Sequence, residues 1–295
     1  MKLVTYSSTK GGIPSIGVMV GDGIVDLPEA SGHRLPATML AFLEGGDAFM
    51  DMARAAVAAA APRPLAEIRL HAPLPRPQSI RDTISFEGHM RFFKERTGRP
   101  VPDVWFERPI YYKGNPATVI GPDDDIRWPN FSEKLDYELE FGVIIGTRGS
   151  DIPIEKALDH VAGYVIFNDM SARETITYET GGNLGPAKGK DFDTGNVMGP
   201  WLVTRDEIDP SDLALEARIN GEVWSRGRSS DMRWSFAQII SFISQSETLH
   251  PGDFIGSGTC EKGCGAELDR WLKPGDVIEL AVEGLGVLRN TVTRA

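Results

Sequence analysis

The pattern of apolar and polar residues predicts a chain built mostly from strands. Short apolar runs bounded by glycine, proline and asparagine are typical of strands that are half or fully buried. The predicted strands cover residues 15–20, 24–27, 118–120, 135–145, 163–167, 201–204, 215–224, 277–282 and 287–292. The dipeptide Asn220-Gly221 interrupts the run at 215–224, and Asn-Gly is a strong signal for a two-residue hairpin turn.

Four stretches predict helices, at residues 37–43, 48–60, 154–160 and 235–246, and the second is rich in alanine, the best helix former. Five prolines follow between residues 62 and 77, a composition typical of a linker or an extended crossing segment. We therefore expect a small N-terminal α+β domain at 1–70 and a second domain at 71–295. The fold class is mostly β (α+β), with a closed or sandwiched mixed sheet in the second domain.

Composition and charge exclude several classes of protein. The chain has 295 residues, 41% of them hydrophobic, which provides ample material for a core. Its net charge of −11 repels nucleic acid and anionic membrane surfaces, so neither is an expected partner. A small anionic substrate stays compatible, because a bound cation can reverse the local potential.

The cysteine count and the N-terminus point to an intracellular enzyme. Cys260 and Cys264, spaced C-x3-C, provide neither a four-cysteine zinc site nor a disulfide framework, and they are expected to be free thiols near a turn. The first residues lack the apolar segment of a secretory signal, and the longest apolar runs are too short to span a membrane. The cytoplasm is the expected location.

The sharpest local feature is a pair of acids in an apolar strand. Glu138 and Glu140 lie two apart in the run 135–145, so a regular strand would place them on one face with Cα atoms about 7 Å apart. Two carboxylates this close repel by roughly 1–4 kcal/mol, and burial adds to the cost. A hard divalent cation removes the repulsion, because it prefers several oxygen ligands. The alternative, that both acids face solvent, stays open.

Three further segments contain weaker candidates. Asp169 ends an apolar strand, where sites are commonly built, although Asn-Asp is also a plain turn signal. Asp82 and His89 lie seven residues apart, but a lone histidine is more often structural than catalytic. Lys190 lies in a glycine-flanked loop, where an exposed charge is the simpler interpretation.

These pieces occur together, in an order that resembles the fumarylacetoacetate hydrolase superfamily. The resemblance runs from about residue 79 to 290, which is most of the chain. Its motifs are P-x-x-Y-x-G at 109–114, D-x-E-x-E at 136–140, N-D-x-S-A-R at 168–173, G-K-x-F-x-T at 189–194, G-P-W at 199–201, and P-G-D with S-G-T at 251–253 and 257–259.

The resemblance implies a fold, a metal and a site. The fold is a mixed β-sandwich roll from about residue 75 onward, and the usual state is a homodimer. The implied metal is Mg²⁺ or Mn²⁺, with Ca²⁺ as a further option. The implied metal residues are Glu138, Glu140, Asp169, Asp82 and Thr194. The implied catalytic residues are His89, which activates water, with Glu267 and Lys190. The implied substrate contacts are Tyr112, Arg173 and Thr259.

Two departures from the family pattern leave details open. After the N-D-x-S-A-R motif the chain reads Glu174-Thr175-Ile176, where the family often has an aspartate followed by a glutamine. Glu267 is the predicted partner of His89, with Asp269 as the alternative, because the residues around 263–268 do not align with the family without a gap.

The resemblance implies hydrolysis of a C–C bond in a small 2-keto or 1,3-diketo acid. Decarboxylation or tautomerisation of oxaloacetate-like acids, and hydration or isomerisation of dienoic acids, use the same kind of metal site and stay open as alternatives. A binding domain without chemistry is a further alternative, and the presence of His89 beside the acids argues against it.

Overall fold

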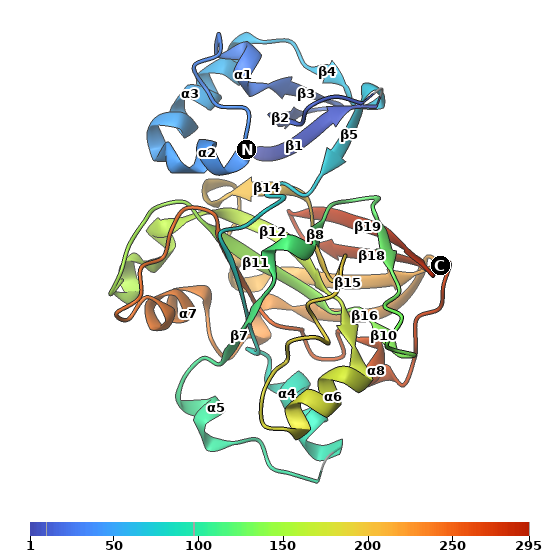
Figure 1. Ribbon diagram of the computed structural model, residues 1–295. Helices are drawn as coiled ribbons and strands as arrows, with labels where there is room; N and C mark the ends of the chain where they lie inside the picture. Colours follow the sequence, from blue (N-terminus) through green and yellow to red (C-terminus); the bar gives the residue numbers. More distant parts are fainter. Residues whose placement is uncertain (10, 97, 295) are drawn as a thin grey trace.

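The computed structural model describes residues 1–9, 11–96 and 98–294 (Figure 1). Within these residues twelve strands form one large mixed sheet, whose main path runs β4-β3-β2-β1-β14-β12-β11-β17-β6-β7, with β5 paired to β1 and β8 to β14. The strands are β1 (Lys2–Ser8), β2 (Ser15–Val20), β3 (Gly23–Asp26), β4 (Arg63–Pro64), β5 (Ile68–His71), β6 (Ser79–Thr83), β7 (Tyr111–Gly114), β8 (Val119–Ile120), β11 (Leu139–Ile145), β12 (Val161–Asp169), β14 (Asn196–Thr204) and β17 (Asp253–Gly256).

A second sheet packs against the middle of the first. In the described chain it has the order β16-β15-β18-β19-β9, and its strands are β9 (Asp125–Arg127), β15 (Ala214–Ile219), β16 (Glu222–Arg228), β18 (Val277–Val282) and β19 (Gly286–Thr293). Its apolar side chains, such as Leu215 and Leu280, share one buried cluster with Phe141 of β11 and Ile166 of β12. This sandwich confirms the predicted mostly-β, α+β class.

The helices are short and lie around the sheets. They are α1 (Leu27–Ala30), α2 (Met39–Glu44), α3 (Gly46–Ala59), α4 (Glu87–Arg96), α5 (Asp103–Glu107), α6 (Arg173–Gly181), α7 (Phe236–Ile243) and α8 (Gly265–Leu268). Figure 1 shows α1, α2 and α3 at one end of the molecule and α4, α5 and α6 at the other. Short 3-10 helices cover Leu65–Glu67, Pro116–Thr118, Ile154–His160, Arg205–Glu207, Pro210–Asp212 and Ser229–Asp231.

Local sequence explains several of these elements. Asn220 and Gly221 have φ of 53° and 81°, the left-handed conformations that a tight hairpin turn between β15 and β16 requires. Ser235 caps α7 through a capping box with Gln238. The predicted helix at 235–246 is thus confirmed in a shorter form, whereas the one at 154–160 is a 3-10 helix rather than an α-helix.

The strand predicted over 135–145 is interrupted. The short strand β10 (Leu135–Asp136) pairs with β13 (Ser171–Ala172), while β11 pairs with β12. Between them Glu138 forms an isolated bridge with Cys264. Glu138 therefore lies just before β11 rather than within one unbroken strand with Glu140.

The N-terminal unit continues the large sheet. β1 pairs with β14 through Lys2–Val203 and Leu3–Leu202, and Leu3 shares a buried cluster with Phe254 of β17. The proline-rich passage is not a free linker, because β4 pairs with β3 and β5 with β1. The division into a domain at 1–70 and a second domain at 71–295 stays a prediction.

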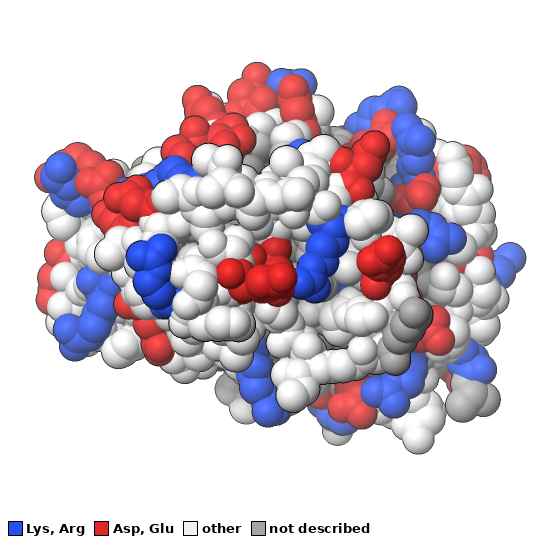
Figure 2. All heavy atoms as spheres, turned by 90° about the horizontal axis from the view of Figure 1, so that it is seen from above, with Lys and Arg blue, Asp and Glu red and all other residues white. Residues whose placement is uncertain are grey.

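The surface of this end of the molecule mixes both signs of charge. Figure 2, which views the molecule from above, shows acidic and basic side chains interspersed among uncharged ones. The described part of that face therefore carries no broad field of one sign, despite the net charge of −11. None of the described helices is long and apolar enough to cross a membrane.

Candidate metal centre and active site

Three carboxylates from different strands of the large sheet meet in the interior. Asp82 lies on β6, Glu140 on β11 and Asp169 at the end of β12. One oxygen from each lies within 4.8 Å of the others. All three residues are at least 97% buried, which excludes the alternative that the glutamates face solvent, since Glu138 is also only 4% exposed. We call Asp82, Glu140 and Asp169 the acid cluster.

A glycine leaves the space that the acid cluster occupies. Gly256 of β17 pairs with Asp82 on one side and with Gly142 of β11 on the other. A Cβ atom at position 256 would lie 2.0 Å from Oδ1 of Asp82 and 3.4 Å from Oε2 of Glu140. Any larger residue there would displace the carboxylate of Asp82, because the surroundings are buried and closely packed.

Burial opposes the ionisation of all three acids. It raises the pKa of Asp82 to about 6. It raises the pKa of Glu140 well above its usual range, and the nearby charges of Asp82 and Asp169 add to the effect. It also raises the pKa of Asp169, although the ammonium of Lys190 acts in the opposite direction. Three buried acids in this arrangement are costly unless a cation balances their charge.

The acid cluster fits a hard divalent cation. Oε2 of Glu140 and Oδ1 of Asp169 are buried and have no hydrogen-bond partner among the described residues. Buried polar atoms without a partner are rare in proteins, and an ion is one of the few groups that explains them. An all-carboxylate ligand set suits Mg²⁺, Mn²⁺ or Ca²⁺ rather than a softer metal.

Glu138 lies beside the acid cluster and is held by two cations. Its carboxylate accepts a hydrogen bond from Nζ of Lys190 at 2.6 Å and forms an ion pair with Nη1 of Arg173 at 2.7 Å. Burial by itself would raise the pKa of Glu138, but attraction to Lys190, Arg173 and His89 outweighs burial and holds the pKa well below its usual range. Nζ of Lys190 also donates to Oδ2 of Asp169, so this ammonium links Glu138 to the acid cluster.

Three predicted site residues contribute hydroxyl groups. Tyr112 donates to Oδ2 of Asp169 at 2.7 Å, and Thr259 donates to Oε1 of Glu140 at 2.9 Å. Both hydroxyls therefore contact the acid cluster directly. The hydroxyl of Thr194 instead accepts a hydrogen bond from the backbone N–H of Arg127 at 2.9 Å. The role of Thr194 at the metal therefore stays a prediction.

His89 and Glu267 form a hydrogen-bonded pair next to Glu138. Nδ1 of His89 lies 3.0 Å from Oε2 of Glu267, and Nε2 lies 3.8 Å from Oε1 of Glu138. Oε1 of Glu267 accepts the backbone N–H of Lys262 at 3.1 Å, which fixes the carboxylate. Asp269, the alternative partner, is exposed and has a φ of 53°. A carboxylate on Nδ1 leaves Nε2 free to accept a proton.

Asp136 is a site residue that the sequence did not reveal. Its buried carboxylate accepts the backbone N–H groups of Gly265 and Ala266 at 2.7 and 3.0 Å, which are the first two residues of α8. It also accepts Nε of Arg173 at 2.8 Å. Asp136 therefore anchors both the helix that carries Glu267 and the guanidinium beside Glu138. Its place as the first acid of the D-x-E-x-E motif was the available signal.

Cys264 is a second residue whose placement was missed. Both cysteines are free, as predicted. Cys264, however, donates its Sγ–H to Oε2 of Glu267 at 3.3 Å, and burial raises the pKa of its thiol well above the usual range. The thiol therefore lies protonated beside the histidine pair, and not merely near a turn.

Metal binding is expected to weaken as the pH falls through about 6, because the ion must then displace a proton from Asp82. In the metal-free protein the raised pKa of Asp82 acts on stability in the opposite sense. The stability that protonated Asp82 contributes to the folded state is fully present below its ordinary pKa of 3.8 and is lost as the pH rises through about 6. Adding Mg²⁺ should therefore raise the melting temperature more at about pH 7.5 than at about pH 5.

Thermal unfolding with Mg²⁺ and after chelation, at both pH values, checks this expectation. Asp82→Asn serves as the control, since its side chain does not titrate, and it should flatten the difference between the two pH values. An equal gain at both pH values in the wild-type protein would contradict the placement of Asp82 at the metal.

Comparisons with known proteins show which family this chain resembles. The family model for the C-terminal domain of fumarylacetoacetate (FAA) hydrolases matches residues 79–293. A mitochondrial oxaloacetate tautomerase of Bos taurus is 35% identical over 299 residues, which cover 99% of this chain and 91% of that protein.

Solved structures extend the likeness. The fumarylacetoacetate hydrolase of Exiguobacterium antarcticum superposes with a TM-score of 0.82 at 29% identity, covering 100% of both chains. The maleylpyruvate hydrolase of Sphingobium sp. SYK-6, solved with a manganese(II) ion and pyruvate, has a TM-score of 0.79 at 23% identity over 100% of both chains, which shows the shared fold. The family match over most of the chain and the close relative together show that this protein belongs to the fumarylacetoacetate hydrolase family of enzymes.

Proposed function

We propose that this protein is a divalent-metal-dependent hydrolase that cleaves a C–C bond in a small 2-keto or 1,3-diketo acid, such as an acylpyruvate or a fumarylacetoacetate-like compound. The observation that carries the proposal is the His89–Glu267 pair, which lies beside Glu138 and the acid cluster. Hydrolysis needs a base for water, whereas proton shifts within a keto acid do not need water to attack.

The residues present are suited to hold the metal. Asp82, Glu138, Glu140 and Asp169 would hold Mg²⁺ or Mn²⁺, with Thr194 as a further contact, and the proposal draws on the manganese in the maleylpyruvate hydrolase of similar fold. When bound, such an ion supplies Lewis acidity that polarises a carbonyl oxygen of the substrate. Thr259 holds Glu140 and Tyr112 holds Asp169 through their hydroxyl groups, so both acids are oriented by hydrogen bonds.

The proton transfer follows from the contacts of His89. With its Nδ1–H donated to Glu267, His89 can take a proton from water at Nε2, and the carboxylate stabilises the imidazolium that forms. Asp136 holds the start of α8, the helix that carries Glu267, and the backbone N–H of Lys262 donates to the carboxylate of Glu267 itself. The base is thus oriented before substrate binds.

Lys190 is the proposed stabiliser of the negative charge that develops when the C–C bond breaks. Its ammonium is buried, and although burial by itself lowers the pKa of a lysine, the carboxylates of Asp169 and Glu138 raise it above its usual range. A permanently charged ammonium in a low-dielectric site stabilises a developing enolate strongly. We also propose that Arg173, Tyr112 and Thr259 line the substrate site and that the enzyme is a homodimer in the cytoplasm.

Oxaloacetate tautomerisation is the second candidate. The observation that favours it is the 35% identity to an oxaloacetate tautomerase across nearly the whole chain. That reaction moves a proton between carbon and oxygen and needs no attacking water, so it requires no base that activates water. The name of that relative also places it in mitochondria, so the cytoplasm stays a proposal for this chain.

A panel of small acylpyruvates, together with oxaloacetate, tests the proposal. Hydrolysis is followed by loss of the diketone absorbance, and tautomerisation by the enol absorbance, each with Mg²⁺, with Mn²⁺ and after chelation. We expect metal-dependent turnover of at least one acylpyruvate with release of two carboxylic or keto acids. Turnover of oxaloacetate enol alone, with every acylpyruvate untouched, would reject hydrolysis in favour of tautomerisation.

A further inference from the structure

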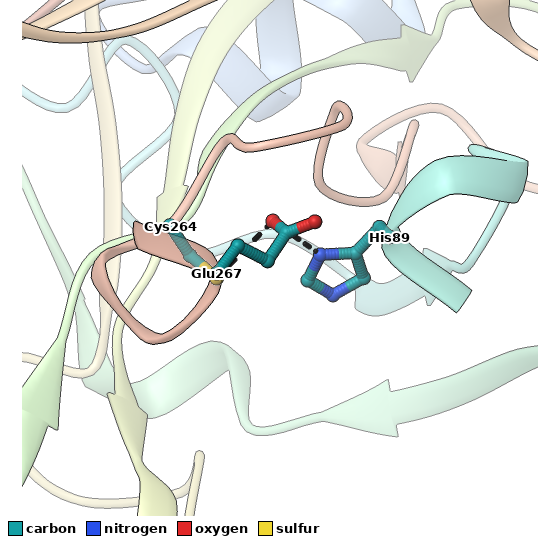
Figure 3. A group of neighbouring side chains, drawn as sticks. All are labelled: His89, Cys264 and Glu267. Carbon is teal, nitrogen blue, oxygen red and sulfur yellow. Dashed lines mark hydrogen bonds and ion pairs between the residues drawn. The ribbon is translucent and has the colours of Figure 1, made fainter. Parts of the chain in front are cut away.

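A second set of metal-type ligands lies outside the acid cluster. Figure 3 shows His89, from α4, facing Glu267 of α8 and Cys264, the residue that precedes α8. One ligand atom from each of the three lies within 4.8 Å of the others. We call His89, Cys264 and Glu267 the mixed trio, because they offer a nitrogen, a sulfur and an oxygen.

Two hydrogen atoms of the mixed trio converge on one carboxylate oxygen. Oε2 of Glu267 lies 3.0 Å from Nδ1 of His89 and 3.3 Å from Sγ of Cys264. The other oxygen, Oε1, is occupied by the backbone N–H of Lys262. A single cation placed among Nδ1, Sγ and Oε2 would replace both hydrogens and bind all three donors at once.

The donor types select a different metal from that of the acid cluster. A thiolate with an imidazole and a carboxylate suits zinc, which binds Cys, His and Glu in a tetrahedral arrangement, whereas Mg²⁺ and Mn²⁺ prefer oxygen. A thiolate and a carboxylate together carry two negative charges, which balance a divalent ion. The nearby guanidinium of Arg173 does not upset this balance, because Asp136 and Glu138 already pair with it.

We propose that His89, Cys264 and Glu267 form an inhibitory binding site for zinc or a similarly thiophilic divalent cation. The thiol releases its proton to solvent, and the sulfur, Nδ1 and Oε2 bind the ion. Because Nδ1 is then occupied, the neutral imidazole carries its proton on Nε2. The inhibitory effect rests on the proposed function, since His89 with a proton on Nε2 cannot take one from water; the binding itself does not.

Zinc binding to the full-length protein tests the site without any activity assay. The protein is stripped with a chelator, saturated with Mg²⁺ and dialysed against zinc. The wild-type protein should retain one zinc ion per chain that excess Mg²⁺ does not displace. Co²⁺ in place of zinc should give the thiolate-to-cobalt absorption band of a sulfur ligand. Cys264→Ser should lose the band and weaken zinc binding by at least about a hundredfold, since even residues that only orient a ligand contribute 10–100-fold.

Cys260→Ser is the matched control, because Cys260 is also buried and free but does not belong to the mixed trio. It should bind zinc and cobalt like the wild-type protein. Cys264→Ala and Glu267→Gln each remove one ligand of the mixed trio by a different substitution. Any of these variants whose melting curve matches that of the wild-type protein is folded and can be used for the test. The proposal is overturned if the Mg²⁺-saturated wild-type protein retains no zinc, or if a folded Cys264 variant binds zinc as tightly as the wild-type protein.

An activity arm separates the two proposals. Zinc should inhibit acylpyruvate hydrolysis by the wild-type protein, and inhibition relative to each variant's own zinc-free rate should disappear in Cys264→Ser. Zinc retention without any hydrolysis would leave the zinc site standing and reject the hydrolase. Hydrolysis without zinc retention would reject the zinc site alone.

Discussion

Replacing Glu140 with glutamine is expected to abolish metal-dependent turnover and yet to make the metal-free protein more stable. Glutamine has the shape of the carboxyl group and can still accept the hydroxyl of Thr259 at Oε1, but it cannot give a charge to a metal. Without the Lewis acid the rate should fall by about a thousandfold or more, since metals contribute several kcal/mol to such reactions and each 1.4 kcal/mol is a factor of ten.

The gain in stability has a separate cause. Burial and the charges of Asp82 and Asp169 raise the pKa of Glu140 far above that of an unfolded chain, so folding without metal must protonate or strain this acid. A neutral side chain removes that cost, and we expect the free energy of unfolding to rise by about 1–3 kcal/mol in the metal-free protein. Adding Mg²⁺ should stabilise the wild-type protein and leave Glu140→Gln unchanged.

Denaturant unfolding with and without chelator, together with turnover, measures both effects. Glu216→Gln is the control, because Glu216 lies on the second sheet and pairs near the surface with Arg218 and Arg226. Its stability should change by less than about 1 kcal/mol and its turnover should be unaltered. A metal-free Glu140→Gln that is less stable than the wild-type protein would argue that the acid cluster is not strained.

Replacing His89 with glutamine should remove hydrolysis and leave metal binding intact. General-base catalysis contributes about 10²–10⁴-fold, so kcat should fall by that factor. The acid cluster does not include His89, so the affinity for Mg²⁺, measured by calorimetry, should stay within about threefold of the wild-type value. Glu267→Gln should show a smaller loss, because the imidazole remains but its orientation and charge partner are weakened.

The control for this prediction is His33→Gln, since His33 is exposed and belongs to the N-terminal unit. Its turnover should equal that of the wild-type protein. If His89→Gln kept its rate of hydrolysis while Glu140→Gln lost it, water activation by His89 would be ruled out, and another group would have to be the base.

The sequence predicted the acids well and their arrangement less well. Asp82, Glu138, Glu140 and Asp169 were expected at one metal, and the structure brings Asp82, Glu140 and Asp169 together with Glu138 beside them. Glu138 was expected on the same regular strand as Glu140, but the chain changes partners between β10 and β11, and Lys190 and Arg173 hold its carboxylate. Strand pairing is set by segments far away in the sequence, so a local pattern could not reveal the interruption.

Burial was the other quantity that the pattern could not decide. The same alternation of residues fits a half-exposed strand, and what covers the glutamates comes from elsewhere in the sequence, including Cys264 beside Glu138 and Gly256 of β17 beside Glu140. Cys264 and Asp136 were missed for a related reason. Each matters through a partner distant in sequence, since Asp136 holds the first N–H groups of α8 and Cys264 bonds with Glu267 next to His89.

The division of the site between sheet and helices has a consequence for how such an enzyme can change over evolution. The carboxylates of the acid cluster are on strands within a continuous sheet, where a substitution disturbs pairing and packing. His89 and Glu267 are on α4 and α8, short helices outside that sheet. Mutations in these two helices can therefore add or remove a base for water while the strands stay as they are. Within this architecture, acquiring a new reaction requires remodelling at the periphery and no redesign of the interior.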